Sequence, residues 1–459
     1  MSLRALAAGI PAVVRRDYVA STAAHWLTLA SGLLLFHLVA RRASVNGFAY
    51  YQVARGVVAT VQPFALLGLV PALHRYLPRA GDRARILALQ AFLVQVVVMD
   101  VLGLIGLVLA DDVGRLLGIP GGVNAARAVV VLAAGNCLVV VTMAGLRGNG
   151  QVRLSNAVSL SGLGLLPLFA FACTTRIDLF LAIQGAAMAF LAFGGIVAVR
   201  RHAPSPQRPP ATPARHPPAP PAEHPPAQHP PAQHPPAPPA LRTLLRFGIR
   251  RAPGEIALPA LFAFPTFFVA GAAPGSPAPG FIGFATSAIT LICSVFGMLT
   301  PVLLPRLSGY FQSAPLHLPG RSGGRSLTRG LKTLPLAAAA LAALGVLFFA
   351  VVAPPLVHNF LGSEFHDAID VLRAALPAAI PLAAFYAARP TLDALQETPV
   401  ISRVLLLCLG VEIALTYATA AVASPAAAAI LGLTVAAVLL GALSYAALLR
   451  AIPARQPRR

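Results

Sequence analysis

Long apolar stretches alternate with short basic segments along almost the whole chain. Each stretch is long enough for an α-helix to cross a bilayer, which takes about 20 residues for a hydrocarbon core of about 30 Å. The six stretches of the first half span 18–40, 52–73, 86–110, 124–146, 154–173 and 179–199. Those of the second half span 248–271, 280–304, 334–357, 368–392, 400–422 and 426–449. The pattern predicts an all-α polytopic membrane protein of about 12 transmembrane helices.

The positive charge of the chain alternates with the predicted helices. The sequence holds 35 Lys and Arg against 14 Asp and Glu, a net charge of +21 that would suggest a nucleic-acid partner in a soluble protein. With the N-terminus placed inside, 28 basic residues fall in cytoplasmic segments, 5 fall outside, and Arg55 and Arg127 lie within helices. Cytoplasmic loops of membrane proteins carry such an excess. We therefore expect a multi-pass protein of the inner (plasma) membrane, with both termini cytoplasmic and no nucleic-acid partner.

The composition limits the domains, metals and cofactors that the chain can be expected to have. The chain is 57% hydrophobic and only 11% charged, which leaves no room for a large soluble domain. Its four cysteines lie in apolar stretches without a CxxC pair, so no metal is predicted. The GxxxxGK[ST] motif of ATP-binding loops is absent, and no cofactor is expected.

A Pro-, Ala- and His-rich segment divides the chain. We predict an N-terminal six-helix half (1–200), a cytoplasmic linker (201–244), a C-terminal six-helix half (245–450) and a basic cytoplasmic tail (451–459). The linker contains repeats such as HPPAQ, which favour polyproline II and bury little surface. Its histidines could bind a soft metal, although the spacer interpretation is favoured.

A short internal sequence repeat indicates a duplication. The segment GLVPALHRYLPR (68–79) ends the second predicted helix, and MLTPVLLPRLSG (298–309) ends the eighth. When Arg75 is aligned with Arg306, both helices finish with an apolar turn, a proline and an arginine. Equivalent helices then run in the same direction, which predicts two six-helix bundles related by a parallel pseudo-two-fold axis along the membrane normal.

Polar groups within the predicted helices are the candidate functional residues, because a charge in the bilayer is costly unless it faces water or a partner. The substrate-binding candidates are Arg55, Arg127, Arg250, Arg251 and Asn136. The ion-coupling candidates are Asp100, Glu255 and Glu412. Structural alternatives remain open: Asp100 could pair with Arg55 or Arg127, Glu255 could neutralise Arg250 or Arg251, and these two arginines could reach lipid headgroups.

Three stretches resemble the polysaccharide-type (Wzx-like) flippase branch of the multidrug/oligosaccharidyl-lipid/polysaccharide (MOP) exporter superfamily. They are GFAYYQVARGVVATVQPFALLGLVPALHRYLPR (47–79), GFIGFATSAITLICSVFGMLTPVLLPRLS (280–308) and NFLGSEFHDAIDVLRAALPAAIP (359–381). The resemblance implies alternating-access transport of an undecaprenyl diphosphate-linked oligosaccharide or polysaccharide precursor, with no enzymatic activity. It also implies a cavity in which Arg55, after an aromatic pair, contacts substrate. The lipid bilayer, the lipid-linked glycan and a glycan polymerase or glycosyltransferases are the partners it suggests.

Two other function classes are compatible with the pattern. A major-facilitator transporter also has twelve helices, but its GxxxDRxGRR loop is not matched by HRYLPRAGDRARIL (74–87). A major-facilitator or MATE-like drug efflux pump is therefore the first alternative. A polytopic glycosyltransferase or polymerase is the second, but the predicted outside loops are short, and the acidic pairs Asp111/Asp112 and Glu364/Asp367 are typical of solvated loops.

Overall fold

The computed structural model describes residues 12–116, 122–201, 240–297, 307, 322–395 and 400–454. Within these ranges the chain forms α-helices with short 3₁₀ and π segments, and no strand occurs in them. Eleven helices are long and apolar enough to cross a membrane, and a bent pair raises the number to 12. The predicted fold class is therefore confirmed. Most of the predicted linker (202–239), the end of the tail (455–459) and most of the segment 298–309 lie outside the described residues.

The helices follow the predicted stretches closely. The first half contains α2 (Ala12–Arg42), α3 (Val45–Ala65), α4 (Leu69–Tyr76), α5 (Ala84–Val108), α6 (Ala110–Leu116), α7 (Gly122–Gly148), α8 (Val152–Ser159), α9 (Leu166–Cys173) and α10 (Ile177–Arg201). The second half contains α11 (Leu241–Ala272), α12 (Ala278–Gly297), α14 (Ser322–Leu356), α15 (Ala368–Ala375), α16 (Ala379–Leu395), α17 (Val400–Thr419) and α18 (Pro425–Ala454). Two π segments, η3 (Leu160–Leu165) and η4 (Val357–Leu361), occur where prolines interrupt the helical hydrogen bonds.

The second predicted span is bent. The axes of α3 and α4 differ by 51°. The bend follows Pro63, and Leu67 and Gly68 at the break have φ values of 49° and 68°. Glycine adopts this left-handed conformation without the steric cost of a Cβ, and here the Gly68 backbone also lies directly against Gly248 of α11. Gln95 of α5 donates from Nε2 to the Ala65 carbonyl (3.3 Å) where α3 ends, so this carbonyl is not left unsatisfied in the bundle.

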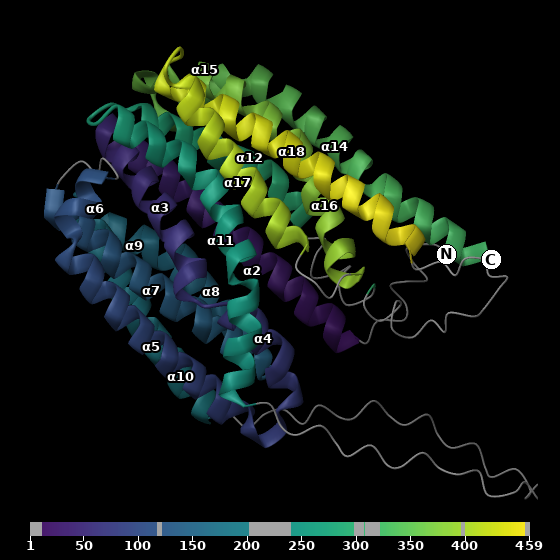
Figure 1. The fold of residues 1–459 in the computed structure, drawn as a ribbon. Helices are drawn as coiled ribbons and strands as arrows, with labels where there is room; N and C mark the ends of the chain where they lie inside the picture. The colour runs from purple at the N-terminus through teal and green to yellow at the C-terminus, as the bar shows by residue number, and fades with distance from the viewer. Residues whose placement is uncertain are drawn as a thin grey trace, which may run out of the picture.

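The helices form two lobes joined by a central layer (Figure 1). In the first lobe α7 packs against α5 and α10, and in the second lobe α16 packs against α14 and α18. Between the lobes, α3 packs against both α11 and α12. These contacts bring helices that are about 200 residues apart in the sequence side by side at the centre of the molecule.

The lobes are held together at one end of the bundle. We call this the far end; it contains the last residues of α2, α11 and α17, and the opposite end, where α10 finishes and α11 begins, is the linker end. At the far end Arg41 Nη2 donates to the carbonyls of Asn359 (2.6 Å) and His358 (3.3 Å) in η4. The rings of Phe48 and Phe281 pack against Phe365 there. From these contacts the lobes diverge toward the linker end (Figure 1).

Candidate functional site

The site is built on a close, parallel contact between α3 and α12. α3 begins after Ser44, whose hydroxyl caps the helix by accepting from the Gly47 N–H. Gly280 lies against Ala49, and Gly283 lies against Gln52, so that a Cβ added at Gly283 would be 2.6 Å from Gln52 Cβ. Both pairs have a sequence offset of 231 residues (280 minus 49 and 283 minus 52). The same offset separates Arg75 from Arg306, so the contact agrees with the duplication that the sequence predicts.

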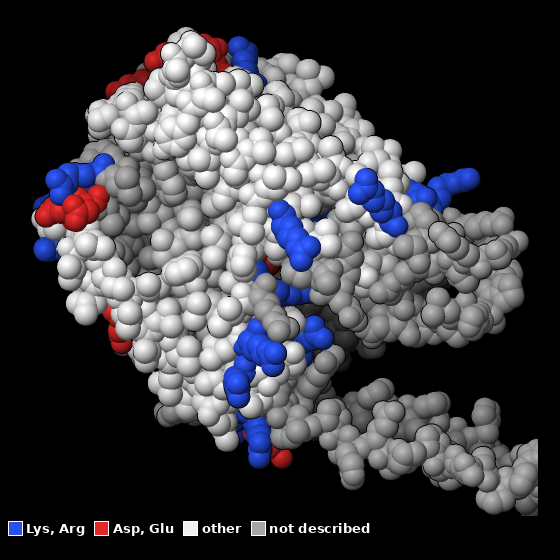
Figure 2. All heavy atoms as spheres, viewed as in Figure 1, with Lys and Arg blue, Asp and Glu red and all other residues white. Residues whose placement is uncertain are grey.

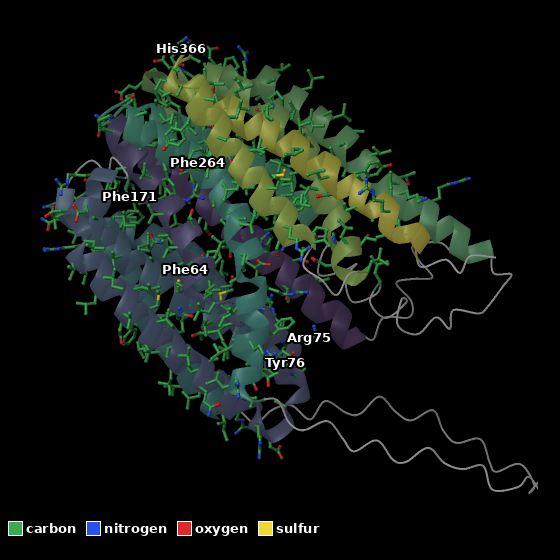
Figure 3. The ribbon with its side chains drawn as sticks, in the orientation of Figure 1. Phe64, Arg75, Tyr76, Phe171, Phe264 and His366 are labelled. Atoms are coloured by element: carbon green, nitrogen blue, oxygen red, sulfur yellow. The ribbon has the colours of Figure 1, made fainter. Side chains whose placement is uncertain are left out.

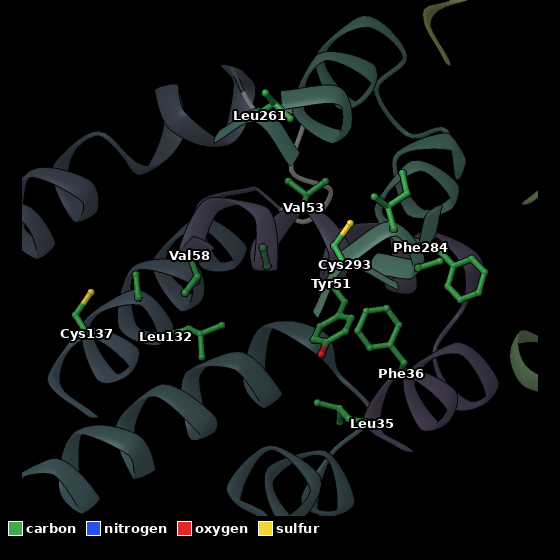
Figure 4. Close-up of a cluster of buried hydrophobic side chains, with 14 of the residues drawn as sticks. Leu35, Phe36, Tyr51, Val53, Val58, Leu132, Cys137, Leu261, Phe284 and Cys293 are labelled. Atoms are coloured by element: carbon green, nitrogen blue, oxygen red, sulfur yellow. The ribbon is translucent and has the colours of Figure 1, made fainter. Parts of the chain in front are cut away.

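Arg55 lies one turn beyond this contact. Its Nη1 donates to Gln52 Oε1 (3.1 Å) and Ser287 Oγ (3.4 Å), so the guanidinium spans from α3 to α12. Its carbon Cζ is 4.4 Å from the centre of the Phe36 ring and 5.8 Å from that of Tyr51. The Phe36 and Tyr51 rings are in edge-to-face contact, as Figure 4 shows. Aromatic faces attract a cation and hold this side chain in position without neutralising its charge.

The Arg55 guanidinium has no acidic partner among the described residues. Among the described residues, no Asp or Glu oxygen lies within 4.0 Å of its nitrogens, and the side chain is exposed in the protein. The hydrogen bonds within the described ranges use only Nη1, which leaves the Nε and Nη2 hydrogens without a protein acceptor. Since the guanidinium keeps its proton, it presents a permanent positive charge with free donors.

The space-filling view shows how charge is distributed over one face of the molecule. Lys and Arg side chains are spread over the middle and right of this face, whereas Asp and Glu lie mainly at its margins (Figure 2). Near the linker end, Arg75 of α4 and Arg251 of α11 both stack on the Phe247 ring, with Cζ at 4.9 and 5.1 Å from its centre. Figure 3 shows Arg75 and Tyr76 together near the lower end of α11. This face therefore favours anions.

The other predicted substrate-binding residues do not converge on Arg55. Arg127 is exposed in the second turn of α7, near the far end. Asn136, also on α7, faces α3, where its Nδ2 is 3.5 Å from Gln62 Oε1. The side chain of Arg250 lies outside the described residues. Arg251 belongs to the stacked cluster on Phe247. The structure thus brings Asn136 to the helix that carries Arg55 but leaves Arg127 and Arg251 at separate positions.

A second charged cluster lies inside the second lobe. Arg389 of α16 donates from Nη2 to Glu255 Oε1 of α11 (3.0 Å), and its Nε is 3.6 Å from Asp393 Oδ2 one turn along. The Arg389 side chain is 22% exposed. With Arg251 and Ser402, these residues line a cavity of about 50 Å³. Glu255, predicted as an ion-coupling residue, is thus paired with Arg389, a partner that was not predicted from the sequence.

Asp100 and Glu412 have opposite surroundings. Asp100 is exposed on the face of α5 that also presents Val97 and Leu104. Within the described residues no ion pair joins Asp100 to Arg55 or Arg127, so the structure does not contain the structural pair that the sequence left open. Glu412 of α17 is fully buried.

Three neighbours of Arg55 were not identified from the sequence: Phe36, Gln52 and Ser287. For Gln52 and Ser287, the sequence nevertheless contained an indication. Gln52 precedes Arg55 by three residues, and the 231-residue offset that aligns Arg75 with Arg306 also sets Gln52 against Gly283, one turn before Ser287. The offset alone did not show that the two equivalent helices touch each other across the molecular centre.

No family model and no curated protein matches the chain. Solved structures do. The inward-facing conformation of a multidrug resistance MATE family transporter of the MOP superfamily has a TM-score of 0.70 at 12% identity, covering 96% of this chain and 99% of that one. The outward-facing conformation of such a transporter scores 0.58 at 13% identity, covering 96% of each chain. The lipid II flippase MurJ in its inward closed conformation scores 0.65 at 11% identity, covering 95% of this chain and 87% of MurJ.

These matches cover almost the entire chain and both halves of the fold. They favour the MOP fold over the major-facilitator fold that the sequence left open, and the proteins matched are transporters rather than enzymes. The chain is therefore a multi-pass membrane protein with the fold of the MOP superfamily transporters.

Proposed function

We propose that this protein moves a lipid-linked glycan precursor carrying a diphosphate, of the undecaprenyl diphosphate type, across the membrane by alternating access. The observation that carries the proposal is Arg55, an exposed guanidinium between the lobes with no acidic neighbour among the described residues. Its free Nε and Nη2 hydrogens form the edge that binds two oxygens of one phosphate group. The two lobes would rock about the α3–α12 contact and expose Arg55 to each side in turn.

Charge separates this proposal from the efflux of cationic drugs. A lipophilic cation would approach Arg55 against a like charge, and no carboxylate of the described residues lies beside Arg55 to compensate. An anionic headgroup gains charge-assisted hydrogen bonds at the same position. The fold is shared by MATE transporters and by MurJ, so it does not by itself choose between the two substrates.

A binding experiment tests this assignment on protein in lipid nanodiscs. The ligands are undecaprenyl diphosphate, undecaprenol and the lipophilic cation tetraphenylphosphonium. We expect the wild type to bind the diphosphate and Arg55→Ala to weaken binding by about tenfold or more, since a hydrogen bond to a charged group contributes about 1.5–3 kcal/mol. Arg55→Lys should retain part of the affinity, because the charge remains while the paired donors are lost.

The matched control is Arg115→Ala, which removes an exposed arginine that already pairs with Asp112 (2.7 Å). Its affinity for the diphosphate should equal that of the wild type. The proposal is wrong if Arg55→Ala binds the diphosphate as tightly as the wild type. A preference of the wild type for tetraphenylphosphonium would favour small-molecule efflux instead.

The orientation and the division into halves belong to the same proposal. The 28 basic residues of the predicted inside segments, against 5 outside, support cytoplasmic termini and a cytoplasmic linker between halves 1–200 and 245–450. Reporter fusions after Arg201, Ala273 and Arg459 measure this directly. A reporter that is active only outside the cytoplasm should work at Ala273 and fail at the other two positions. Activity at Arg201 or Arg459 would overturn the topology.

A further inference from the structure

The buried face of α17 contains an acid that the proposed substrate site does not use. Along α17, all of which is described, the buried side chains are those of Leu405, Cys408, Glu412 and Thr416. Their spacing of three or four residues places them on one face of the helix. The other sides of α17 expose apolar residues such as Leu406 and Tyr417. Glu412 therefore does not face the surroundings of the protein but lies in the seam where α17 packs against the second lobe.

The seam leaves its polar atoms without partners. Among the described residues, neither Glu412 Oε1 nor Oε2 has a hydrogen-bond partner, and Thr416 Oγ1, one turn along, has none either. α18 closes over them at Gly432, where a Cβ would overlap Thr416 Oγ1 and lie 3.0 Å from the Glu412 carbonyl oxygen. Buried polar atoms almost always have a hydrogen-bond partner. Two adjacent buried groups without one, Glu412 and Thr416, therefore indicate a site whose hydrogen bonds form in another conformation of the protein.

No fixed cation neutralises this carboxyl. α17 packs against α11, α18 and, less extensively, α16. The titratable side chains of these elements are Arg403, Cys408 and Tyr417 on α17, Tyr445 and Arg450 on α18, Tyr386, Arg389 and Asp393 on α16, and Arg242, Arg246, Arg250, Arg251 and Glu255 on α11. Within the described residues no Arg or Lys nitrogen is within 4.0 Å of Glu412, and Cys408 is the group that interacts with it electrostatically.

We propose that Glu412 is a proton-binding site of the transport cycle, with the Thr416 hydroxyl as its hydrogen-bond partner when the α17–α18 seam repacks. The inference rests on the proposed transport function. An ionised carboxylate without a partner is strongly disfavoured in this apolar seam, so the carboxyl carries a proton while the seam is closed. Opening the seam to water lets the proton leave to a water molecule. Because one conformation favours the bound proton and the other its release, proton binding and the movement of the lobes are thermodynamically linked.

Labelling with dicyclohexylcarbodiimide tests proton occupancy in the wild-type protein. This reagent adds to a protonated carboxyl in an apolar site, giving an O-acylisourea that rearranges to a stable N-acylurea, which peptide mass spectrometry locates. We expect labelling at Glu412 that rises as the pH falls. Glu255, which pairs with Arg389 at 3.0 Å, is the internal control and should remain unlabelled. Absence of labelling at Glu412 overturns the proposal. The proposal is also wrong if, at constant pH, labelling is weaker in sodium chloride than in choline chloride, because this result would indicate a metal-cation site.

The single tryptophan, Trp26, reports whether the proton is linked to movement. It lies on α2, whose far end bonds to η4 across the lobes. Its emission in nanodiscs should show a pH transition in the wild type. Glu412→Gln, which mimics the neutral acid, should lose the transition and keep the emission of the acidic side.

Two matched variants control for other groups that titrate. Glu364→Gln changes an exposed acid, and His37→Gln removes a histidine of α2 itself, whose Nδ1 is 2.7 Å from the Phe360 carbonyl oxygen. Both should keep the transition. A pH transition that persists in Glu412→Gln overturns the proposal. The proposal is also wrong if, in the wild type, Glu412 is labelled equally at every pH and Trp26 emission stays constant. Neither measurement uses the glycan substrate, so both can fail while Arg55 still binds diphosphate.

Discussion

Two arginines of the helix bundle show two uses of the same side chain. Arg389 lies in the second lobe between two carboxylates, at 3.0 Å from Glu255 and 3.6 Å from Asp393. Arg55 lies between the lobes with an amide, a hydroxyl and two aromatic rings, and no carboxylate within 4.0 Å in the described residues. A charge that is neutralised within one lobe can contribute to the packing of that lobe. A charge that stays unneutralised between lobes is available to a ligand.

The largest effect is expected from Arg389→Ala. This change leaves the carboxylates of Glu255 and Asp393 close to each other without their cation, so we expect a loss of about 3 kcal/mol in stability, at the lower end for a broken internal ion pair because the cluster is partly exposed. Thermal unfolding in detergent measures it. Arg403→Ala, an exposed arginine of the same lobe, is the control and should keep the wild-type Tm. Equal Tm values for the two variants would contradict a structural role for Arg389.

Gly283→Val should come next, because it acts on the contact that positions Arg55. The added side chain would meet Gln52, whose Oε1 accepts a hydrogen bond from Arg55 Nη1, and overpacking of a close contact costs about 2 kcal/mol. The Tm should fall, and diphosphate binding should weaken although Arg55 itself is unchanged. Gly410→Val is the control, since the space around Gly410 is open. Unaltered binding by Gly283→Val would mean that the α3–α12 contact does not hold Arg55 in place.

Arg41→Ala should have a smaller effect, because the partners of Arg41 are neutral. Its guanidinium donates to two backbone carbonyls of η4 from an exposed position, so we expect a loss of about 1 kcal/mol in the contact between lobes. The result should be a shift of population away from the conformation closed at the far end. Trp26 emission at fixed pH measures this shift, with Arg42→Ala as the neighbouring control. An unchanged emission would show that this contact does not stabilise the closed far end.

Arg55→Ala should have the smallest effect on stability, in contrast to Arg389→Ala. Its removal leaves no carboxylate unpaired in the described residues, so the Tm should change by the equivalent of about 0.5 kcal/mol or less. Loss of diphosphate binding with an unchanged Tm is the combination expected of a ligand-binding residue. A fall in Tm as large as that of Arg389→Ala would instead assign Arg55 a structural role.

The sequence predicted some elements well for a simple reason. The bounds of α7 and α17 lie within about three residues of the prediction, because the length of a membrane helix follows from the apolar stretch itself. Pro63 and Pro71 in the second apolar stretch indicate that this helix is interrupted. The sequence did not show that the break, at Leu67 and Gly68, lies against Gly248, which is 180 residues away from Gly68 (248 minus 68), because no local pattern shows this contact.

For the candidate charged residues, too, the sequence predicted one feature and not another: it identified the residues but not their partners. The chain by itself determined which polar groups enter the bilayer, because charged residues are rare among apolar stretches, and Arg55, Asp100, Glu255 and Glu412 could be named from this alone. The partners of these groups follow from the packing of the helices. Arg389 meets Glu255 across 134 residues, Arg55 meets Ser287 across 232, Asp100 faces outward, and Glu412 is enclosed by α18. Hydropathy is a property of each segment, whereas the pairing of charges depends on which helix faces pack together.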